Sequence, residues 1–486
     1  MRSSIPEAFA ALAAAGLLAA APLSAADPPP PPAAVPSAEP QPPAPPPLAA
    51  HAPGQAPEAP PAAPPRGELS AVERRVVEWI GGHADEAIAL LAEAVEISSP
   101  TEDHAGVRRV GDLFAREFAA IGFTPRWVDL PPELDRAGHL FAERRGTARA
   151  RAEGTRLLLI GHLDTVLPST GWRREGDAAH GSGASDMKGG DVIVLYALKA
   201  LEAAGALDGR QVIVAFTGDE EEPGRPREVA REALREAARE SDVALGFEGA
   251  VPGSATVARR GISSWRLEVS ATTGHSSLIF KDSHGYGAIF EAARILDAMR
   301  RTVAPEEYLT ANPGWAVGGS RVTDDPEADQ GTAGGKTNII ADRVVVEGDL
   351  RFLTAEQLAA AEERLRALAA GDNLPGTRAE ISFFPGYPPM APTEGNHAVL
   401  AVLDGVSRDL GYGPIEPHDP GARGAADVSF VADLVDGALD GLGAMGHREH
   451  APDEWVELDK LPMLIERAAL LIHRLLEQPR PAAPPG

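Results

Sequence analysis

The sequence predicts an α/β fold in which a mainly parallel sheet is flanked by helices and carries an inserted ferredoxin-like α+β domain. The parallel sheet is predicted by short, wholly apolar runs, which are typical of strands buried on both faces. These runs lie at residues 155–161, 211–217 and 242–246, and helical patterns at residues 191–203 and 227–240 follow between them. The alternation of strand and helix indicates helices on both faces of the sheet.

The inserted domain is predicted by a change of pattern after Gly261. Strand and helix patterns then follow in the order β-α-β-β-α-β, which is typical of a ferredoxin-like domain. We expect strands at residues 264–271, 343–351 and 377–384, helices at 286–301 and 355–370, and a further strand within 314–322.

The two ends of the chain differ from this globular part. Residues 1–26 begin with the basic Arg2, continue through an Ala/Leu-rich stretch and end in small residues, as secretory signal peptides do. Residues 27–66 are mainly proline and alanine, which predicts a disordered linker, and residues 479–486 predict a disordered tail. We therefore expect a periplasmic or secreted protein without a membrane span in the mature chain; an uncleaved N-terminal anchor is the alternative.

Composition limits the partners and the chemistry. The formal net charge is -26, from 45 basic and 71 acidic residues, which argues against binding to nucleic acid or to anionic membranes. The chain has no cysteine, so it contains neither disulfides nor thiolate ligands. Any bound metal must therefore be held by histidine, aspartate and glutamate.

Residues that can bind metals follow the predicted strands, at the edge of a parallel sheet where ligand sites form. They are His162 and Asp164 after the first strand, Asp186 in a glycine-rich loop, Glu220 and Glu221 after the next strand, Glu248 after the third, and His450 near the C-terminus. The His-x-Asp spacing lets the carboxylate of Asp164 orient the ring of His162. The glycine-rich loop at residues 181–190 also suggests a phosphate cradle, but it lacks the P-loop pattern and places Asp186 where an anion would bind.

With these motifs, residues 70–476 resemble the zinc metallopeptidase family that includes glutamate carboxypeptidase, aminoacylase, acetylornithine deacetylase and succinyl-diaminopimelate desuccinylase. The resemblance implies two divalent metal ions that share Asp186. The family's pattern gives one ion His162 and Glu248 as further ligands and gives the other ion Glu221 and His450. Nitrogen and oxygen ligands suit zinc, with cobalt or manganese as alternatives.

The same resemblance implies that Glu220 is the general base and that Asp164 supports His162 from behind. Three glutamates follow Asp219, so a shifted alignment, with Glu221 as base and Glu222 as ligand, stays open. We prefer the first alignment because it keeps the motif contiguous with the end of the strand.

The resemblance also implies substrate-contacting residues in the inserted domain. His275 matches a histidine that stabilises the oxyanion, often from the neighbouring subunit, and Asn338 and Arg351 match residues that bind the substrate carboxylate. The alternatives are a surface histidine, a turn asparagine and an ion pair at the end of a strand. His447 is expected to be exposed or behind the ligands, and the segment at residues 424–427 is given no chemical role.

The predicted organisation therefore combines the two metal-binding segments with the insertion. Residues 67–260 and 386–478 form a catalytic domain, and residues 261–385 form a lid and dimerisation domain, which implies a possible homodimer. We expect a metal-dependent exopeptidase, like a carboxypeptidase or dipeptidase, that cuts an amide bond next to a free carboxylate in a small peptide. An N-acyl-amino-acid deacylase is the alternative in the same family; a non-catalytic binding protein and a structural envelope protein are rivals from other classes.

Overall fold

The computed structural model describes residues 68–148, 153–325 and 330–480. The predicted signal peptide and linker therefore lie outside the described residues. Of the predicted tail, Pro479 and Arg480 are described, and the backbone N–H of Arg480 donates to the carbonyl of Glu153 at 2.8 Å. Within the described residues, no helix combines the length and the apolar character needed to cross a membrane.

The predicted α/β fold is confirmed by a six-stranded sheet with the strand order β1-β2-β6-β3-β7-β16. Strands β6, β3, β7 and β16 pair in parallel, while β2 pairs with both β1 and β6 in antiparallel fashion. The bounds are β1 Thr124–Val128, β2 His139–Arg144, β3 Leu157–His162, β6 Val212–Thr217, β7 Val243–Gly246 and β16 Gly437–Leu439.

Alternate side chains of the central strands enter two different cores. Leu157 and Leu159 of β3 join one apolar cluster, and Leu158 and Ile160 join another on the opposite face. Because successive side chains of a strand point to opposite faces, a strand covered on both sides must be apolar throughout. This explains why the runs that predict these strands show no polar alternation.

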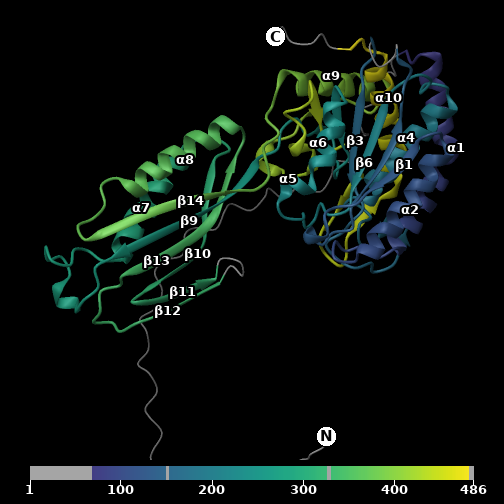
Figure 1. Ribbon diagram of the computed structural model, residues 1–486. Coiled ribbons are helices and arrows are strands. Elements are labelled where there is room, and N and C mark those ends of the chain that lie inside the picture. The colour runs from purple at the N-terminus through teal and green to yellow at the C-terminus, as the bar shows by residue number, and fades with distance from the viewer. Residues whose placement is uncertain (1–67, 149–152, 326–329, 481–486) are drawn as a thin grey trace, which may run out of the picture. The chain divides into compact units, whose positions relative to one another are not determined.

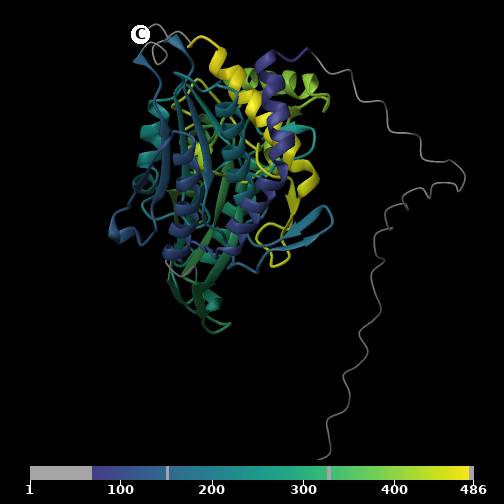
Figure 2. The ribbon, with the colours of Figure 1, turned by 90° about the vertical axis from the view of Figure 1, so that its right-hand side faces the viewer.

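Helices cover both faces of this sheet (Figure 1). Residues of α1, α2, α4, α9 and α10 join the first cluster, and residues of α6 join the second. Figure 2 shows α1 and α10 side by side, so the first and last long helices pack together. The bounds are α1 Ala71–Glu96, α2 His104–Ala120, α4 Lys188–Ala203, α5 Arg227–Ala230, α6 Glu232–Arg239, α9 Glu394–Asp409 and α10 Leu461–Glu477.

The prediction of one helix over residues 227–240 is wrong. The structure has two short helices, α5 and α6, separated by Arg231, whose φ of -101° and ψ of 5° leave the helical range. The side chain of Arg231 is fully buried and forms ion pairs with Asp219 and Asp427. A buried ion-pair network therefore overrides the local helical pattern.

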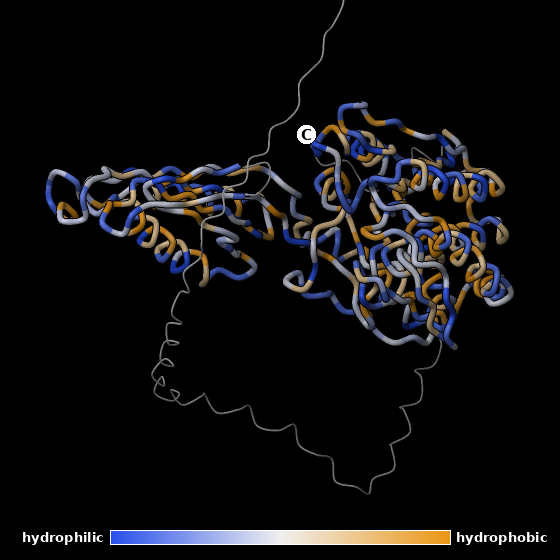
Figure 3. Tube along the Cα trace, turned by 90° about the horizontal axis from the view of Figure 1, so that it is seen from below, coloured by the Kyte–Doolittle hydropathy of each residue, from blue (hydrophilic) through white to orange (hydrophobic). Residues whose placement is uncertain are grey.

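Residues 261–385 form a second sheet, with the order β10-β13-β9-β14 and antiparallel pairing throughout. Helices α7 and α8 pack on one face of it, around a separate apolar core that includes Trp265, Val346 and Leu365 (Figures 1 and 3). This part is called the small domain below. The bounds are β9 Gly261–Ala271, α7 Ala288–Val303, β10 Thr310–Gly319, β13 Arg343–Phe352, α8 Ala355–Ala370 and β14 Thr377–Pro385.

The strand expected within residues 314–322 is present as the second half of β10, which begins earlier, at Thr310. The structure has β10, which ends at Gly319, followed by a separate hairpin of β11 Arg321–Asp325 and β12 Gln330–Gly334. The exposed strands β11 and β12 have few large apolar residues, so the alternation that would reveal them is weak. The remaining order matches the predicted β-α-β-β-α-β pattern.

Short strands lie near the edge where the parallel strands of the large sheet end, and they form separate small sheets. Another four-stranded sheet, β17-β18-β5-β4, brings the segment around residue 450 next to the loop that follows β5. Its strands are β4 Arg173–Glu175, β5 Ala178–His180, β17 Gly446–His447 and β18 Trp455–Glu457; β8 Ser254–Ala255 pairs with β15 Glu416–Pro417 elsewhere. Segments more than 250 residues apart in the sequence thus meet at this edge.

Candidate metal centre

His162 is the last residue of β3, and its ring is fixed by the residue two positions later. The Nδ1 atom lies 3.0 Å from the backbone carbonyl oxygen of Asp164 and 3.4 Å from its carboxylate Oδ1. The other ring nitrogen, Nε2, lies 3.3 Å from Oδ1 of Asp186. His162 is almost fully buried, so its Nε2 is directed into the cluster and not toward bulk solvent.

Asp164 links three parts of the site. Its carboxylate accepts hydrogen bonds from the Thr101 hydroxyl at 2.7 Å and from the backbone N–H groups of Glu220 at 3.0 Å and Glu221 at 3.1 Å. Burial raises the pKa of Asp164, but the hydrogen bonds from His162, Thr101 and Glu220 outweigh this effect. The pKa of Asp164 therefore lies below that of an ordinary aspartate. Asp164 therefore orients His162 and also fixes the loop that carries the two glutamates.

Asp186 lies in the loop between β5 and α4, and a buried glutamate holds that loop. The carboxylate of Glu454 accepts hydrogen bonds from the backbone N–H groups of Gly183 at 2.9 Å, Ser185 at 2.8 Å and Asp186 at 3.0 Å. The peptide bond between Asp186 and Met187 is cis. Burial raises the pKa of Glu454 to about 7 despite these hydrogen bonds.

The two oxygens of Asp186 face two different imidazoles. Oδ1 lies 3.3 Å from Nε2 of His162, while Oδ2 lies 3.0 Å from Nε2 of His450. A further carboxylate lies beside each ring: Glu248 is 4.0 Å from Nε2 of His162, and Glu221 is 3.2 Å from Nε2 of His450. Side chains from four other segments therefore gather around Asp186.

Burial and crowding of carboxylates shift the pKa values of the cluster. Burial, together with the charges of Asp186 and Asp440, raises the pKa of Glu248 to about 8. Burial also raises the pKa values of Glu220 and Glu221. Hydrogen bonds to Asp186 and Glu221 raise the pKa of His450 to about 11. Carboxylates crowded in this way, with imidazole nitrogens beside them, fit the ligand preference of divalent cations such as zinc.

The chemistry of these donors therefore fits the predicted metal ligands. One ligand atom each from His162, Asp186 and Glu221 lies within 4.8 Å of the others. His450 and Glu248 extend this group on its two sides through the contacts above.

The geometry favours the first of the two alignments for the glutamates. Glu221 points to His450, whereas Glu222 is exposed and pairs with Arg136 at 3.1 Å. Glu220 lines a small cavity with His162, Glu248 and Asp427, beside the cluster. Glu220 is thus close to the ligands without lying between the two imidazoles.

The structure does not bring the predicted substrate-contacting residues into the cluster. Nδ1 of His275 lies 2.9 Å from the Ser277 hydroxyl, and the Ser276 N–H donates to the carbonyl of Asn338 at 2.8 Å. Arg351 pairs with Asp349 at 2.8 Å, as in the alternative of a strand-end ion pair. Across residues 68–148, 153–325 and 330–480, no hydrogen bond or ion pair joins any of these three to the metal ligands.

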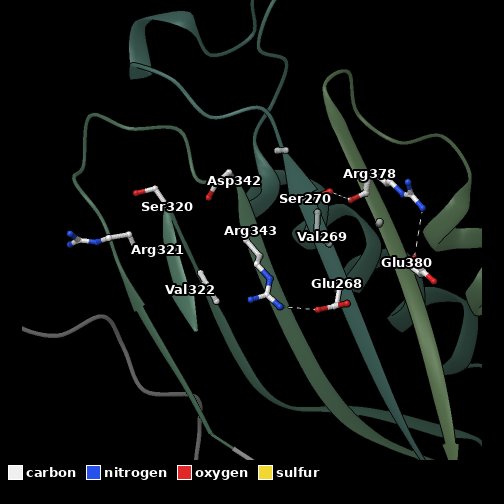
Figure 4. Close-up of a pocket in the computed structure, with 12 residues that line it drawn as sticks. Glu268, Val269, Ser270, Ser320, Arg321, Val322, Asp342, Arg343, Arg378 and Glu380 are labelled. Atoms are coloured by element: carbon white, nitrogen blue, oxygen red, sulfur yellow. Dashed lines mark hydrogen bonds and ion pairs between the residues drawn. The ribbon is translucent and has the colours of Figure 1, made fainter. Parts of the chain in front are cut away.

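His447 also lies outside the cluster, with its Nε2 3.4 Å from Glu457. A groove of about 620 Å³ on the helix-free face of the small domain is a separate feature (Figure 4). Its charged side chains neutralise one another, as the 2.9 Å pair of Arg343 and Glu268 illustrates. It contains no histidine, so it offers no imidazole ligand and does not compete with the cluster as a metal centre.

Several functional residues were missed from the sequence. Glu454 lies four residues after His450, the predicted metal ligand of the same segment. Its role follows only from its contacts with residues 183–186. Two buried ion pairs were also missed: Arg231 with Asp427, and Arg259 with Asp440. Their partners are 196 and 181 positions apart, so no local pattern indicates them.

Comparisons with known proteins find a matching family model, similar relatives and a solved structure of similar fold. A model of the peptidase family M20/M25/M40 matches residues 158–474. Carboxypeptidase G2 of Pseudomonas sp. is 25% identical over 394 residues, which cover 79% of this chain and 88% of that protein. Succinyl-diaminopimelate desuccinylase of Acidovorax ebreus is 26% identical over 389 residues, covering 76% and 93%. In fold, the crystal structure of aminopeptidase PepT from Bacillus cereus matches with a TM-score of 0.64 at 19% identity, covering 81% and 98%.

Proposed function

Because the chain belongs to peptidase family M20/M25/M40, a family of hydrolases that cut amide bonds, we propose that it is a dizinc exopeptidase resembling a carboxypeptidase or dipeptidase. Its substrate would be a small peptide whose scissile amide lies next to a free carboxylate. The single observation that carries the proposal is the position of Asp186, whose two oxygens face His162 and His450 separately.

In this proposal each side of Asp186 belongs to one metal ion. His162, Asp186 and Glu248 would hold the first ion, and Asp186, Glu221 and His450 would hold the second. Nitrogen and oxygen ligands suit zinc, and cobalt or manganese could replace it. When bound, two such ions would polarise the amide carbonyl and lower the pKa of the attacking water.

Glu220 is proposed as the general base. The carboxylate would accept a proton from the attacking water and then deliver it to the nitrogen of the leaving amine. Burial and the nearby charge of Glu248 raise the pKa of Glu220, which suits a carboxyl group that must deliver a proton as well as accept one. Asp164 would keep Glu220 in place through its hydrogen bond to the backbone N–H at 3.0 Å.

The substrate carboxylate requires a cationic partner, and Arg351 with Asn338 remains our proposal for it. A guanidinium can bind a carboxylate through two parallel hydrogen bonds. Arg351 would have to exchange its present partner, Asp349, for the substrate. We also keep His275 as the proposed oxyanion stabiliser and the small domain as the proposed dimer contact. Export through residues 1–26 is proposed on sequence alone.

A deacylase is the second candidate, because the match to succinyl-diaminopimelate desuccinylase covers 76% of the chain, close to the 79% that the match to carboxypeptidase G2 covers. A panel of dipeptides and N-acetyl amino acids, assayed with each candidate metal, separates the two. Preferred cleavage of dipeptides supports the exopeptidase, and preferred release of acetate supports the deacylase.

The role of Glu220 is tested by Glu220→Gln. We expect kcat to fall at least about a thousandfold while the bound metal, measured by inductively coupled plasma mass spectrometry, stays at the wild-type level. Glu222→Gln serves as the matched control, because that carboxylate is exposed and paired with Arg136. Wild-type turnover by the Glu220→Gln variant would exclude the proposed mechanism.

A further inference from the structure

We propose that a buried network of Asp219, Arg231 and Asp427 positions the catalytic loop that carries Glu220. The network would make Arg231 and Asp427 positioning residues, acting through Glu220 and not on the substrate. This inference rests on the proposed function, because it takes Glu220 as the general base. It gives a role to Asp427, the last residue of the segment at residues 424–427.

Arg231 is the centre of the network. Its side chain is fully buried, and its Nε donates to Oδ1 of Asp427 at 2.6 Å. Its Nη1 donates to Oδ1 of Asp219 at 2.6 Å, and its Nη2 donates to the backbone carbonyl of Asp219 at 3.1 Å. One guanidinium therefore fixes both the side chain and the backbone of the residue before Glu220.

Asp427 connects the same guanidinium to the end of β6. Its Oδ2 accepts a hydrogen bond from the hydroxyl of Thr217, the last residue of that strand, at 2.6 Å. The other carboxylate, Asp219, accepts from the N–H of Gly224 at 2.9 Å, where the loop leaves the site. The network thus holds the loop at both of its ends.

Glu220 is held from its other sides as well. The backbone N–H donates to Asp164 at 3.0 Å, and its carbonyl accepts from the Tyr387 hydroxyl at 3.2 Å. The side chain lines a small cavity that Asp427 also lines. With Asp219 fixed just before it, the backbone of Glu220 has little freedom, so its carboxylate is aimed by contacts that involve no metal ligand side chain.

The local structure indicates that the network is favoured over simpler packing. Arg231 interrupts what would otherwise be a continuous helix, and arginine is rarely fully buried unless its charge is paired. Two buried carboxylates must be matched by one guanidinium, and its fork geometry suits two partners. A hydrophobic residue at this position would leave Asp219 and Asp427 without a counter-charge.

A second buried pair of the same chemistry provides a matched comparison. Arg259 donates from Nε to Oδ2 of Asp440 at 2.6 Å, and Oδ1 of Asp440 accepts from the backbone N–H of Glu248 at 3.3 Å. This pair is fixed to the proposed metal ligand Glu248, whereas the first pair is fixed to the loop of the proposed base. Removing the charge of Asp427 should therefore slow catalysis, whereas removing the charge of Asp440 should weaken metal binding.

The test compares Asp427→Asn, Asp440→Asn and Asp297→Asn in the full chain. Asp297 is a control on α7, where it forms exposed pairs with Arg300 and Arg301. For each variant we would measure kcat and KM with the dipeptide cleaved fastest in the panel. Metal content after dialysis against a chelator and thermal unfolding of the metal-free protein complete the set.

We expect Asp427→Asn to lower kcat at least tenfold with KM and metal content within twofold of wild type. Asp440→Asn should instead lose metal during dialysis, and Asp297→Asn should match wild type. Thr217→Val keeps every charge and removes the 2.6 Å hydrogen bond to Asp427 together with a longer one, at 3.4 Å, to the carbonyl of Gly161; it should lower kcat several-fold with unchanged metal content. A crystal structure of metal-free Asp427→Asn should show the Glu220 carboxylate displaced.

A kcat within twofold of wild type for both Asp427→Asn and Thr217→Val would overturn the proposal. So would a loss of kcat that excess zinc restores, because the network would then act through metal retention. These outcomes differ from failure of the proposed function, which would appear as an active Glu220→Gln variant. If Asp427→Asn does not fold, Thr217→Val alone decides the result.

Discussion

The position of His162 depends on a glycine, so Gly161→Ala is a sensitive probe of the site. A methyl group at residue 161 would lie 2.1 Å from Oδ1 of Asp191, whereas ordinary contact begins at 3.4 Å. Met187 and Phe216 would each lie 3.0 Å away on other sides. Because Asp191 is fully buried, the shortfall of 1.3 Å (3.4 minus 2.1) must be relieved by turning its carboxylate within a packed interior or by moving β3 or α4.

Overpacking of this kind costs about 1–3 kcal/mol in the free energy of unfolding. Any movement of β3 also displaces His162, the next residue along the strand. The metal-free protein can relax part of this strain, whereas the metal-bound protein must keep His162 in place. Every 1.4 kcal/mol or so of strain that remains only in the metal-bound protein weakens metal binding about tenfold. We therefore expect Gly161→Ala to be both less stable and weaker in metal affinity than wild type.

The assay is urea unfolding of the metal-free protein, followed by tryptophan fluorescence, together with a metal titration. Gly82→Ala is the control, because nothing lies within 4 Å of the added methyl group in α1. It should raise stability by about 0.5–1 kcal/mol, since alanine is the better helix former. A Gly161→Ala variant with the unfolding midpoint and metal affinity of wild type would refute the reasoning.

Two further predictions concern the ligands. Glu221→Gln should lose bound metal, whereas Glu222→Gln should keep it, because only Glu221 lies beside His450; metal loss from Glu222→Gln alone would restore the shifted alignment. Metal binding at pH 7 should release protons. The pKa of Glu248 is raised to about 8 and that of His450 to about 11, so both groups carry protons at pH 7 that the metal must displace. Apparent affinity should therefore rise from pH 6 to pH 8, and calorimetry in buffers of different ionisation enthalpy should detect the protons; equal heats in all buffers would contradict this.

The sequence predicted the part of the site that follows from strand order. The rule that ligands gather at the carboxyl ends of parallel strands brings His162, Glu221 and Glu248 together without knowledge of any contact. The same reasoning could not choose between Glu221 and Glu222, because the choice depends on which side chain the turn directs toward His450. That direction is set by Asp164, through hydrogen bonds to two backbone N–H groups.

The remaining features depend on contacts between distant segments. Arg231 lies in a stretch that favours a helix, and only its partners Asp219 and Asp427 explain the break. The role of Glu454 likewise requires the loop around Ser185 to be placed against it. The hairpin of β11 and β12 escaped prediction because its exposed strands carry little apolar alternation. Local sequence patterns therefore predict most helices and strands, whereas contacts between distant segments decide where a helix breaks and how a loop is placed.

The central claim is that His162, Asp186, Glu221, Glu248 and His450 hold two metal ions that share Asp186. Anomalous X-ray diffraction from crystals of the zinc-loaded protein tests this directly. We predict two anomalous peaks, one bonded to His162 and Glu248, the other to Glu221 and His450, and both bonded to Asp186. Peaks elsewhere, or no peak within bonding distance of Asp186, would contradict the account.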